Sequence, residues 1–123
     1  MSTDNQIEQE IQAKGKTAPR ITPADIEANI AEEFYFTAKD GAIAAEYHIS
    51  PVINDEVLPT LALLTFCVIV LRNGFTVTGE SACASPENFD AEIGRKVARQ
   101  NAVQKIWPLM GYELKTWLSN GGL

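Results

Sequence analysis

The clearest hydrophobic pattern in the chain is a pair of apolar runs, residues 62–72 and 75–83, which meet at Asn73-Gly74. Asn-Gly between two such runs predicts a β-hairpin with a type I′ turn, because both central residues of that turn adopt positive φ and these residue types tolerate it. A hairpin alone is marginally stable in water. We therefore expect another part of this chain, or another copy of it, to cover the two strands.

The type I′ turn places Arg72 opposite Phe75 and Cys67 opposite Glu80, and this register divides the hairpin into two faces. One face is expected to form the core: Leu64, Phe66, Val68, Val70, Phe75 and Val77. The other face joins apolar residues of the first strand to a polar row on the second. A strand that is apolar on both sides is typical of burial on both sides. We expect a second copy, most simply in a dimer, to cover this other face through Thr65, Cys67, Ile69, Leu71 and Thr76.

Helical signals flank the hairpin. Thr22 as N-cap and Pro23 at the first helical position predict a helix at 23–33. The main helix is expected at 91–106, with small residues at every third or fourth position that let it lie close to a sheet. It begins either at Ser85-Pro86 or at Asp90. Pro108 lacks the amide donor of a helical hydrogen bond, so we expect a separate helix at 109–118.

The fold class is therefore expected to be α+β, with a short antiparallel sheet built on the hairpin at about 62–83 and packed against the 91–106 helix. Residues 21–120 form one domain in this interpretation. Residues 1–20 are polar apart from Ile7 and Ile11, so we expect a flexible arm. Alternating apolar residues favour a short strand within 42–50, followed by a loop at 50–59.

The charge of the chain is acidic and unevenly distributed. The 123 residues carry a formal net charge of −6, which argues against a broad, non-specific grip on nucleic acid. Residues 1–60 hold 4 basic and 11 acidic residues, and residues 61–123 hold 6 and 5. No signal-peptide pattern opens the chain, and the apolar run at 61–71 is too short to span a bilayer. These observations favour a cytoplasmic protein.

Catalytic chemistry is poorly supported by the residue pattern. His48 is the single histidine, and Glu80 is the only carboxylate on the hairpin. The sequence has no glycine-rich phosphate loop and no Cys/His set with metal-ligand spacing. Cys67 and Cys83 are expected on opposite faces of the hairpin, so a disulfide between them is not expected. We therefore expect no enzymatic activity, no metal and no cofactor.

A basic cluster on the main helix favours binding. Arg95 and Arg99 are four residues apart and share a helix face, with Lys96 beside them. Guanidinium groups in such a set suit a phosphate or a carboxylate. Asn101 and the hairpin residue Thr78 complete the predicted contacts with a small anionic ligand. The alternative interpretation is an ordinary surface network of ion pairs, which contributes little.

The segments NGFTVTGES and NFDAEIGRKVARQNAVQKIWPL, with TPADIEANIAEEFYFTAKDG upstream, carry a family resemblance. Over about residues 20–118 the chain resembles a family of small proteins from tailed phages and prophages. The naming members of that family come from a lytic coliphage and a temperate Shigella phage. The resemblance implies no assigned activity, cofactor or catalytic residue. It implies a phage or prophage accessory protein made in the host bacterial cytoplasm.

These observations lead to three hypotheses about function. The first is a non-enzymatic accessory protein that binds and neutralises a host component, specifically by sequestering a nucleotide-type ligand at a homo-oligomer interface. The alternative is a protein–protein interaction module that inhibits or redirects a host protein, through the acidic N-terminal half or the arm with Ile7 and Ile11. The third is an enzyme that uses Glu80 or His48.

Overall fold

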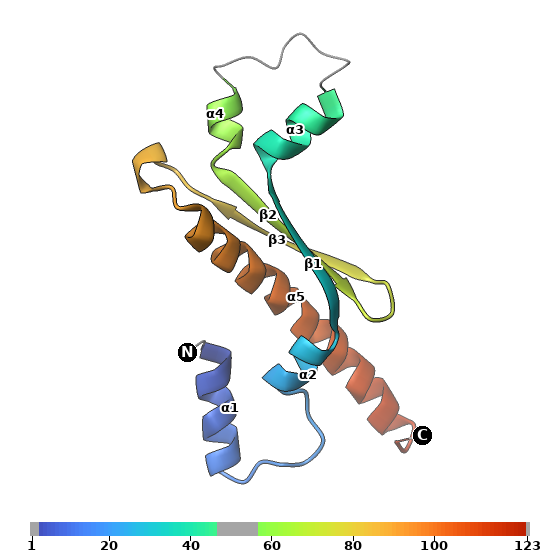
Figure 1. Ribbon diagram of the computed structural model, residues 1–123. Helices are drawn as coiled ribbons and strands as arrows, with labels where there is room; N and C mark the ends of the chain where they lie inside the picture. Colours follow the sequence, from blue (N-terminus) through green and yellow to red (C-terminus); the bar gives the residue numbers. More distant parts are fainter. Residues whose placement is uncertain (1–2, 47–56, 123) are drawn as a thin grey trace.

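Three antiparallel strands and one long helix organise the molecule, as the computed structural model shows for residues 3–46 and 57–122 (Figure 1). The sheet has the order β1-β2-β3, and its elements confirm the expected α+β class. In chain order the elements are α1 (Thr3–Ala13), α2 (Pro23–Ala28), β1 (Ile30–Thr37), α3 (Ala38–Glu46), α4 (Leu58–Leu61), β2 (Leu64–Leu71), β3 (Thr76–Ala82), the 3-10 turn η1 (Pro86–Asn88) and α5 (Ala91–Ser119).

The first edge strand, β1, lies where the sequence predicts the end of a helix. Thr22 caps α2 as expected: its hydroxyl accepts a hydrogen bond from the Asp25 amide, and the Asp25 carboxylate accepts one from the Thr22 amide. The helix nevertheless ends at Ala28 rather than at residue 33. Residues 30–37 are rich in aromatic residues, which suit a strand, and they pair with β2 along its length.

The hairpin forms as expected, but its predicted register is wrong by one residue. Cys67 pairs with Gly79, not with Glu80. The connection is a three-residue loop in which the Gly74 amide donates to the Leu71 carbonyl and the Leu71 amide donates to the Phe75 carbonyl. Within this loop only Gly74 has positive φ, at 89°, so Asn73 does not adopt the conformation that a type I′ turn requires. The longer loop shifts every pair between the strands.

This shift changes which residues of the two strands share a face of the sheet. Val77 pairs with Ile69, so it joins the odd-numbered residues of β2 on the face that α5 covers, which we call the inner face. Ile69 is fully buried there. The even-numbered residues of β2, with Phe34 and Phe36 of β1, lie on the opposite side, which we call the outer face. The prediction that Leu64, Phe66, Val68 and Val70 face the core is therefore wrong.

The helix α5 runs unbroken from Ala91 to Ser119, so the predicted separation at Pro108 is wrong. Pro108 is exposed, while Ile106 before it is buried and Met110 after it packs against the core. Packing on both sides of the proline offsets the loss of one helical hydrogen bond. Of the two predicted starts, Asp90 is the N-cap, because its carboxylate accepts a hydrogen bond from the Ile93 amide at 3.0 Å.

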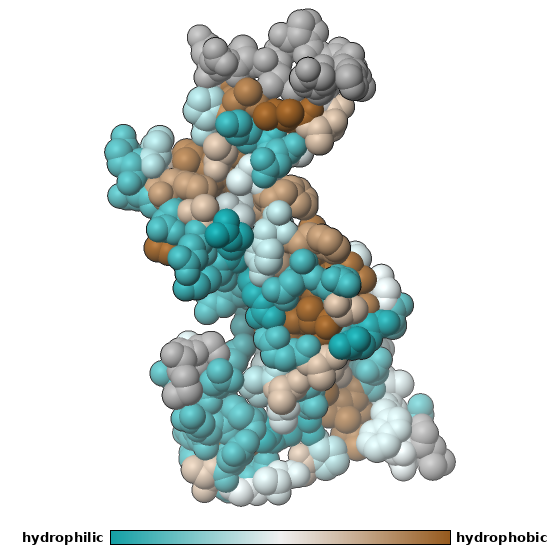
Figure 2. Space-filling model, in the orientation of Figure 1, coloured by the Kyte–Doolittle hydropathy of each residue, from teal (hydrophilic) through white to brown (hydrophobic). Residues whose placement is uncertain are grey.

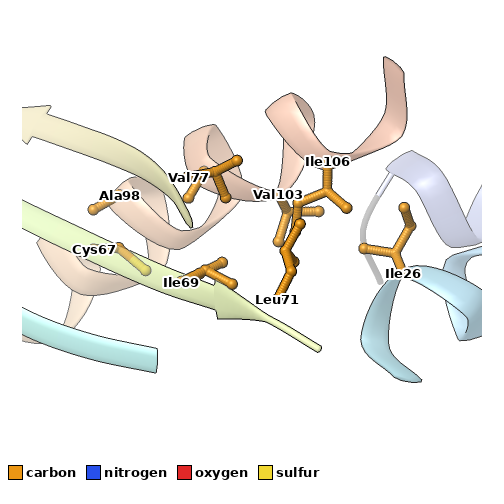
Figure 3. Close-up of a cluster of buried hydrophobic side chains, with 9 residues drawn as sticks. Ile26, Cys67, Ile69, Leu71, Val77, Ala98, Val103 and Ile106 are labelled. Carbon is orange, nitrogen blue, oxygen red and sulfur yellow. The ribbon is translucent and has the colours of Figure 1, made fainter. Parts of the chain in front are cut away.

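A close approach of α5 to β3 forms the centre of the core (Figure 3). A Cβ atom at Gly79 would lie 2.1 Å from the Ala98 carbonyl oxygen and 2.3 Å from the Ala102 nitrogen. Ala98 and Ala102 are fully buried, which agrees with the predicted stripe of small residues. Figure 3 shows Ile69 and Leu71 pointing toward α5, with Ile26 of α2 beyond Ile106.

Two further segments differ from the prediction. Ile43 and Ala45, expected in a strand within 42–50, lie in α3, and the rest of that prediction, Tyr47 to Ser50, falls outside the described residues. Residues 3–13 form α1 where a flexible arm is predicted. The helix is attached by its polar side chains, since the Trp107 indole donates to the Asp4 carboxylate at 3.2 Å.

Candidate functional site

Arg99, the central residue of the predicted anion site, is already held by two carboxylates. Its Nη2 lies 2.7 Å from Glu27 Oε2, and its Nε lies 3.2 Å from Glu33 Oε2. The hydrogen bonds that Arg99 donates to Glu27, followed by the negative charges of Glu27 and Glu33, raise the pKa of Arg99. The guanidinium therefore joins α5 to α2 and β1. It has little capacity left to neutralise a ligand.

The other predicted anion contacts do not gather around Arg99. Asn101 donates a hydrogen bond to the Glu80 carbonyl at 2.8 Å, and Lys96 lies 3.2 Å from Glu92 in an exposed pair along α5. Thr78 pairs with Val68 and is exposed on the outer face. The sheet therefore separates Thr78 from the helix that carries the basic residues.

Arg95 has no ion-pair partner in the part of the chain that the structure describes. It borders a cavity of about 110 Å³ between β1, α3 and the start of α5, with Thr37 and Thr65 also on its wall. Asp40 also borders this cavity, and the hydrogen bond that its carboxylate accepts from the Thr37 amide lowers its pKa. The cavity thus combines one cation with a carboxylate that stays ionised.

Four of the five predicted interface residues are not at the surface. Thr65, Cys67, Ile69 and Leu71 are all buried on the inner face beneath α5. The fifth, Thr76, is exposed and lies on the outer face. The physical reason is the register shift described above, which places Val77 and Gly79 beside these residues and allows α5 of the same chain to cover them.

The side chains with potential reactivity are held in structural roles. Burial raises the pKa of the Cys67 thiol, which keeps it from being a ready nucleophile. The Tyr35 hydroxyl donates to Glu33 at 3.0 Å, and burial together with this carboxylate raises the pKa of Tyr35. Within the described ranges, no three histidine, cysteine or carboxylate side chains lie close enough to share a metal ion. His48 falls outside those ranges.

A groove of about 590 Å³ runs between α5, α2 and the start of α1. Its apolar wall includes Ile93, which is 60% exposed, together with Val97 and Trp107. Arg99 and Glu27 neutralise each other at its side. The sequence pattern did not reveal this groove, because it depends on α1 and α2 packing beside a helix that is more than sixty residues away.

The outer face of the sheet presents the phenylalanine side chains of β1 to solvent. Phe34 is 54% exposed and Phe36 is 40% exposed. The Phe36 ring packs on Phe66, with 5.6 Å between the ring centroids. In Figure 2, brown and tan side chains interrupt the teal surface over the strands and between α3 and α4, whereas α1 is mostly teal. Exposed apolar surface of this kind is typical of interaction sites.

Three rows of paired residues cross the outer face, each with one residue from every strand. In strand order they are Phe36, Phe66, Glu80; then Phe34, Val68, Thr78; then Glu32, Val70, Thr76. The two carboxylates, Glu32 and Glu80, occupy opposite corners of this set. None of the strand residues described on this face is a lysine or an arginine. The alternation around Phe34 and Phe36 is the sequence signal that could have predicted β1 and this surface.

Residues 21–118 match the model of the Phage protein (N4 Gp49/phage Sf6 gene 66) family. The chain belongs to this phage protein family. The match covers the whole sheet and nearly all of α5, and it leaves α1 outside. No curated protein and no solved structure is significantly similar to the chain. Among residues 3–46 and 57–122 of this phage protein, no helix has both the length and the apolar character needed to cross a membrane.

Proposed function

We propose that this phage protein is a non-enzymatic accessory protein that binds a host protein in the bacterial cytoplasm and inhibits or redirects it. The binding surface is the outer face of the sheet. The observation that carries the proposal is the exposure of Phe34 and Phe36 beside Phe66, on a face that α5 leaves uncovered. Aromatic anchors of this kind supply much of the free energy of protein–protein binding.

Charge complementarity indicates what kind of surface the partner should present. Glu32 and Glu80 border the aromatic rows at opposite corners, and the chain as a whole carries a net charge of −6. A matching surface therefore has apolar residues at its centre and lysine or arginine residues at its rim. Basic surfaces of this kind are typical of proteins that normally bind nucleic acid. Occupying such a surface would keep the host protein from its own ligand.

The test compares the outer face with an even more exposed apolar surface on α5. The variant Phe34→Ser with Phe36→Ser removes the aromatic anchors, and the control Ile93→Ser with Tyr112→Ser changes two exposed residues of α5, 60% and 78% exposed. The tagged unmodified protein, the variant and the control are each incubated with host lysate. The host protein that is captured is then purified and titrated against each of the three. Circular dichroism establishes that all three remain folded.

We expect the unmodified protein and the α5 control to bind the purified host protein equally. The outer-face variant should bind at least about tenfold more weakly, because each buried aromatic anchor typically contributes more than 1 kcal/mol. Association should also slow as salt is raised, since opposite charges steer the encounter. Equal binding by all three proteins, or loss only in the α5 control, would overturn the proposal.

Sequestration of a small anionic, nucleotide-type ligand is the second candidate function, and Arg95 is the residue that favours it. Arg95 borders a cavity together with Thr37 and Thr65 and has no ion-pair partner among the described residues. Calorimetry with cyclic and linear nucleotides tests it. Heat of binding that disappears in Arg95→Ala would support this candidate. The absence of heat with the intact, folded protein would eliminate it.

A further inference from the structure

The two edges of the sheet differ in which backbone groups remain unpaired. In an antiparallel ladder each residue directs its amide and carbonyl to one neighbouring strand, and successive residues alternate in direction. The Leu71 amide donates to Phe75 of the hairpin, and the Cys83 amide donates to Leu63. Odd-numbered residues of β2 therefore bond to β3, and even-numbered ones, such as Val68, bond to β1.

The same alternation identifies the outward groups of β3. Residues Thr76, Thr78 and Glu80 direct their backbone groups away from β2. The Glu80 carbonyl accordingly accepts a hydrogen bond from the Asn101 side chain of α5, at 2.8 Å. This contact both agrees with the alternation and protects the β3 edge, because a side chain of α5 occupies an acceptor that an added strand would need.

The β1 edge has no comparable protection. Phe34 pairs with Val68 and directs its backbone toward β2, so Glu33 and Tyr35 direct theirs outward. The Thr37 amide, next along this edge, is bound to the Asp40 carboxylate at 2.9 Å. No partner for the amide and carbonyl groups of Glu33 and Tyr35 lies in the described part of the chain. Two donors and two acceptors thus stand free on an edge strand that contains neither proline nor lysine, residues that usually protect such edges.

We propose that β1 pairs antiparallel with β1 of a second copy of this chain, with a two-fold axis beside Phe34. Glu33 then lies opposite Tyr35 of the partner subunit, and all four free backbone groups of each copy find partners. Shifting the pairing by one step in one direction would place Glu33 opposite Glu33 of the partner subunit. Shifting it the other way would use Thr37, whose amide is already bound. The register on Phe34 is therefore the one that satisfies every free group.

The side chains suit the same register. Phe34 meets its symmetry mate on the outer face in a non-hydrogen-bonded pair, where side chains approach most closely. Glu32 lies across from Phe36 of the partner subunit, so the exposed carboxylates of the two copies stay apart. Arg99 already neutralises the charge of Glu33. The resulting dimer has a continuous six-stranded sheet, with an α5 helix from each copy on one face and the two outer faces joined on the other. The proposal of this dimer rests on the geometry of the β1 edge and not on the proposed host partner.

The first test measures the mass of the full chain in solution as a function of concentration, by sedimentation. The variant Phe34→Lys places two ammonium groups against each other at the axis and should weaken the dimer at least tenfold. The control Phe75→Lys changes a residue of equal exposure, 55% against 54%, in the hairpin loop, and should leave the dimer intact. Mixing Phe34→Lys with Phe34→Glu protein should restore dimers, because only a symmetric contact brings these two side chains together.

The second test distinguishes edge pairing from stacking of two outer faces. Hydrogen exchange should show the Glu33 and Tyr35 amides protected in the dimer and exposed in Phe34→Lys, while the Thr78 amide on the other edge exchanges rapidly in both. A dimer in which the Glu33 and Tyr35 amides exchange freely would indicate stacked faces and overturn the proposal. A chain that remains monomeric throughout the concentration range would overturn it as well.

Discussion

The two faces of the sheet are similar in composition and opposite in environment. Both take apolar residues from the same strand, with Cys67 and Ile69 on the inner face and Phe66 and Val68 on the outer face. The inner residues are fully buried, whereas the outer ones remain partly accessible. The difference arises from Gly79, whose missing side chain lets α5 settle on the inner face alone. Hydrophobicity makes a face suitable for burial, but the backbone fit decides whether it is buried by its own chain.

The largest effect is expected from Gly79→Ala. The added Cβ would lie 2.1 Å from a backbone oxygen of α5 and 2.3 Å from a backbone nitrogen, so the helix must move off the inner face. We expect a loss of about 3 kcal/mol or more, at the upper end of the cost of overpacking, measured by chemical denaturation. Gly111→Ala is the control, because nothing lies within 4 Å of its Cβ position and alanine favours a helix. Equal effects of the two substitutions would show that the close approach does not limit the packing.

Neighbouring residues of β2 provide the next comparison. Ile69→Ala removes a fully buried side chain from the inner face and should destabilise the fold by about 2 to 5 kcal/mol through the cavity it leaves. Val68→Ala on the outer face should cost about 1 kcal/mol or less, because its environment is already partly open. Urea denaturation of both variants measures the difference. A larger effect for Val68→Ala would mean that the outer face is the better packed of the two.

A smaller effect is expected at the margin of the inner face, where Arg99 joins α5 to Glu27 and Glu33. Arg99→Met should cost about 1 to 2 kcal/mol, because it removes charged hydrogen bonds and leaves a half-buried carboxylate without its partner. Lys96→Met removes an ion pair of the same helix that is about three-quarters exposed, and should cost less than about 0.5 kcal/mol. Thermal and urea unfolding provide the measurement. Similar losses would assign Arg99 to the solvated surface and leave it available to a ligand.

The smallest effect belongs to α1, which touches neither face of the sheet. A hydrogen bond from Arg20 lowers the pKa of Glu8 from 4.5 to about 2. A lowered carboxylate pKa stabilises the folded form above the ordinary value, and that contribution disappears as the pH falls from about 4.5 through 2. The unfolding midpoints of the unmodified chain and Glu8→Gln should therefore differ slightly at neutral pH and converge near pH 2. A difference that does not change with pH would exclude the Glu8 charge as its cause.

Local signals in the sequence predicted much of the fold. Thr22 and Asp90 cap the helices that they were expected to begin, and Ala98 and Ala102 form the expected close-packed stripe. These features depend on residues within one or two helical turns, so they are readable in a single segment. The length of the loop at Asn73 was harder to predict from the sequence, because Asn-Gly suits both a two-residue loop and the three-residue loop that forms. The choice between these two loops sets the register.

The candidate site was predicted less completely, and Arg99 shows why. Its neighbours Arg95 and Lys96 are visible in the sequence, but Glu27 and Glu33 reach it from segments more than sixty residues away. No local pattern shows that a cation will be neutralised by distant carboxylates. The exposed aromatic residues of β1 were missed for a related reason, since the alternation at 30–37 follows directly on a helical pattern.

The sequence by itself determined the α+β character of this phage protein, the hairpin strands and the helix caps, because these depend on short-range periodicity and backbone preference. Only the tertiary structure decided which face of β2 is buried, where β1 pairs and which charges cancel. The physical reason is that alternation along a strand separates two faces without ranking them. A one-residue change of register, set by the loop, decides which residues of β3 join each face of β2, and the close approach of Gly79 to α5 then buries one of these faces.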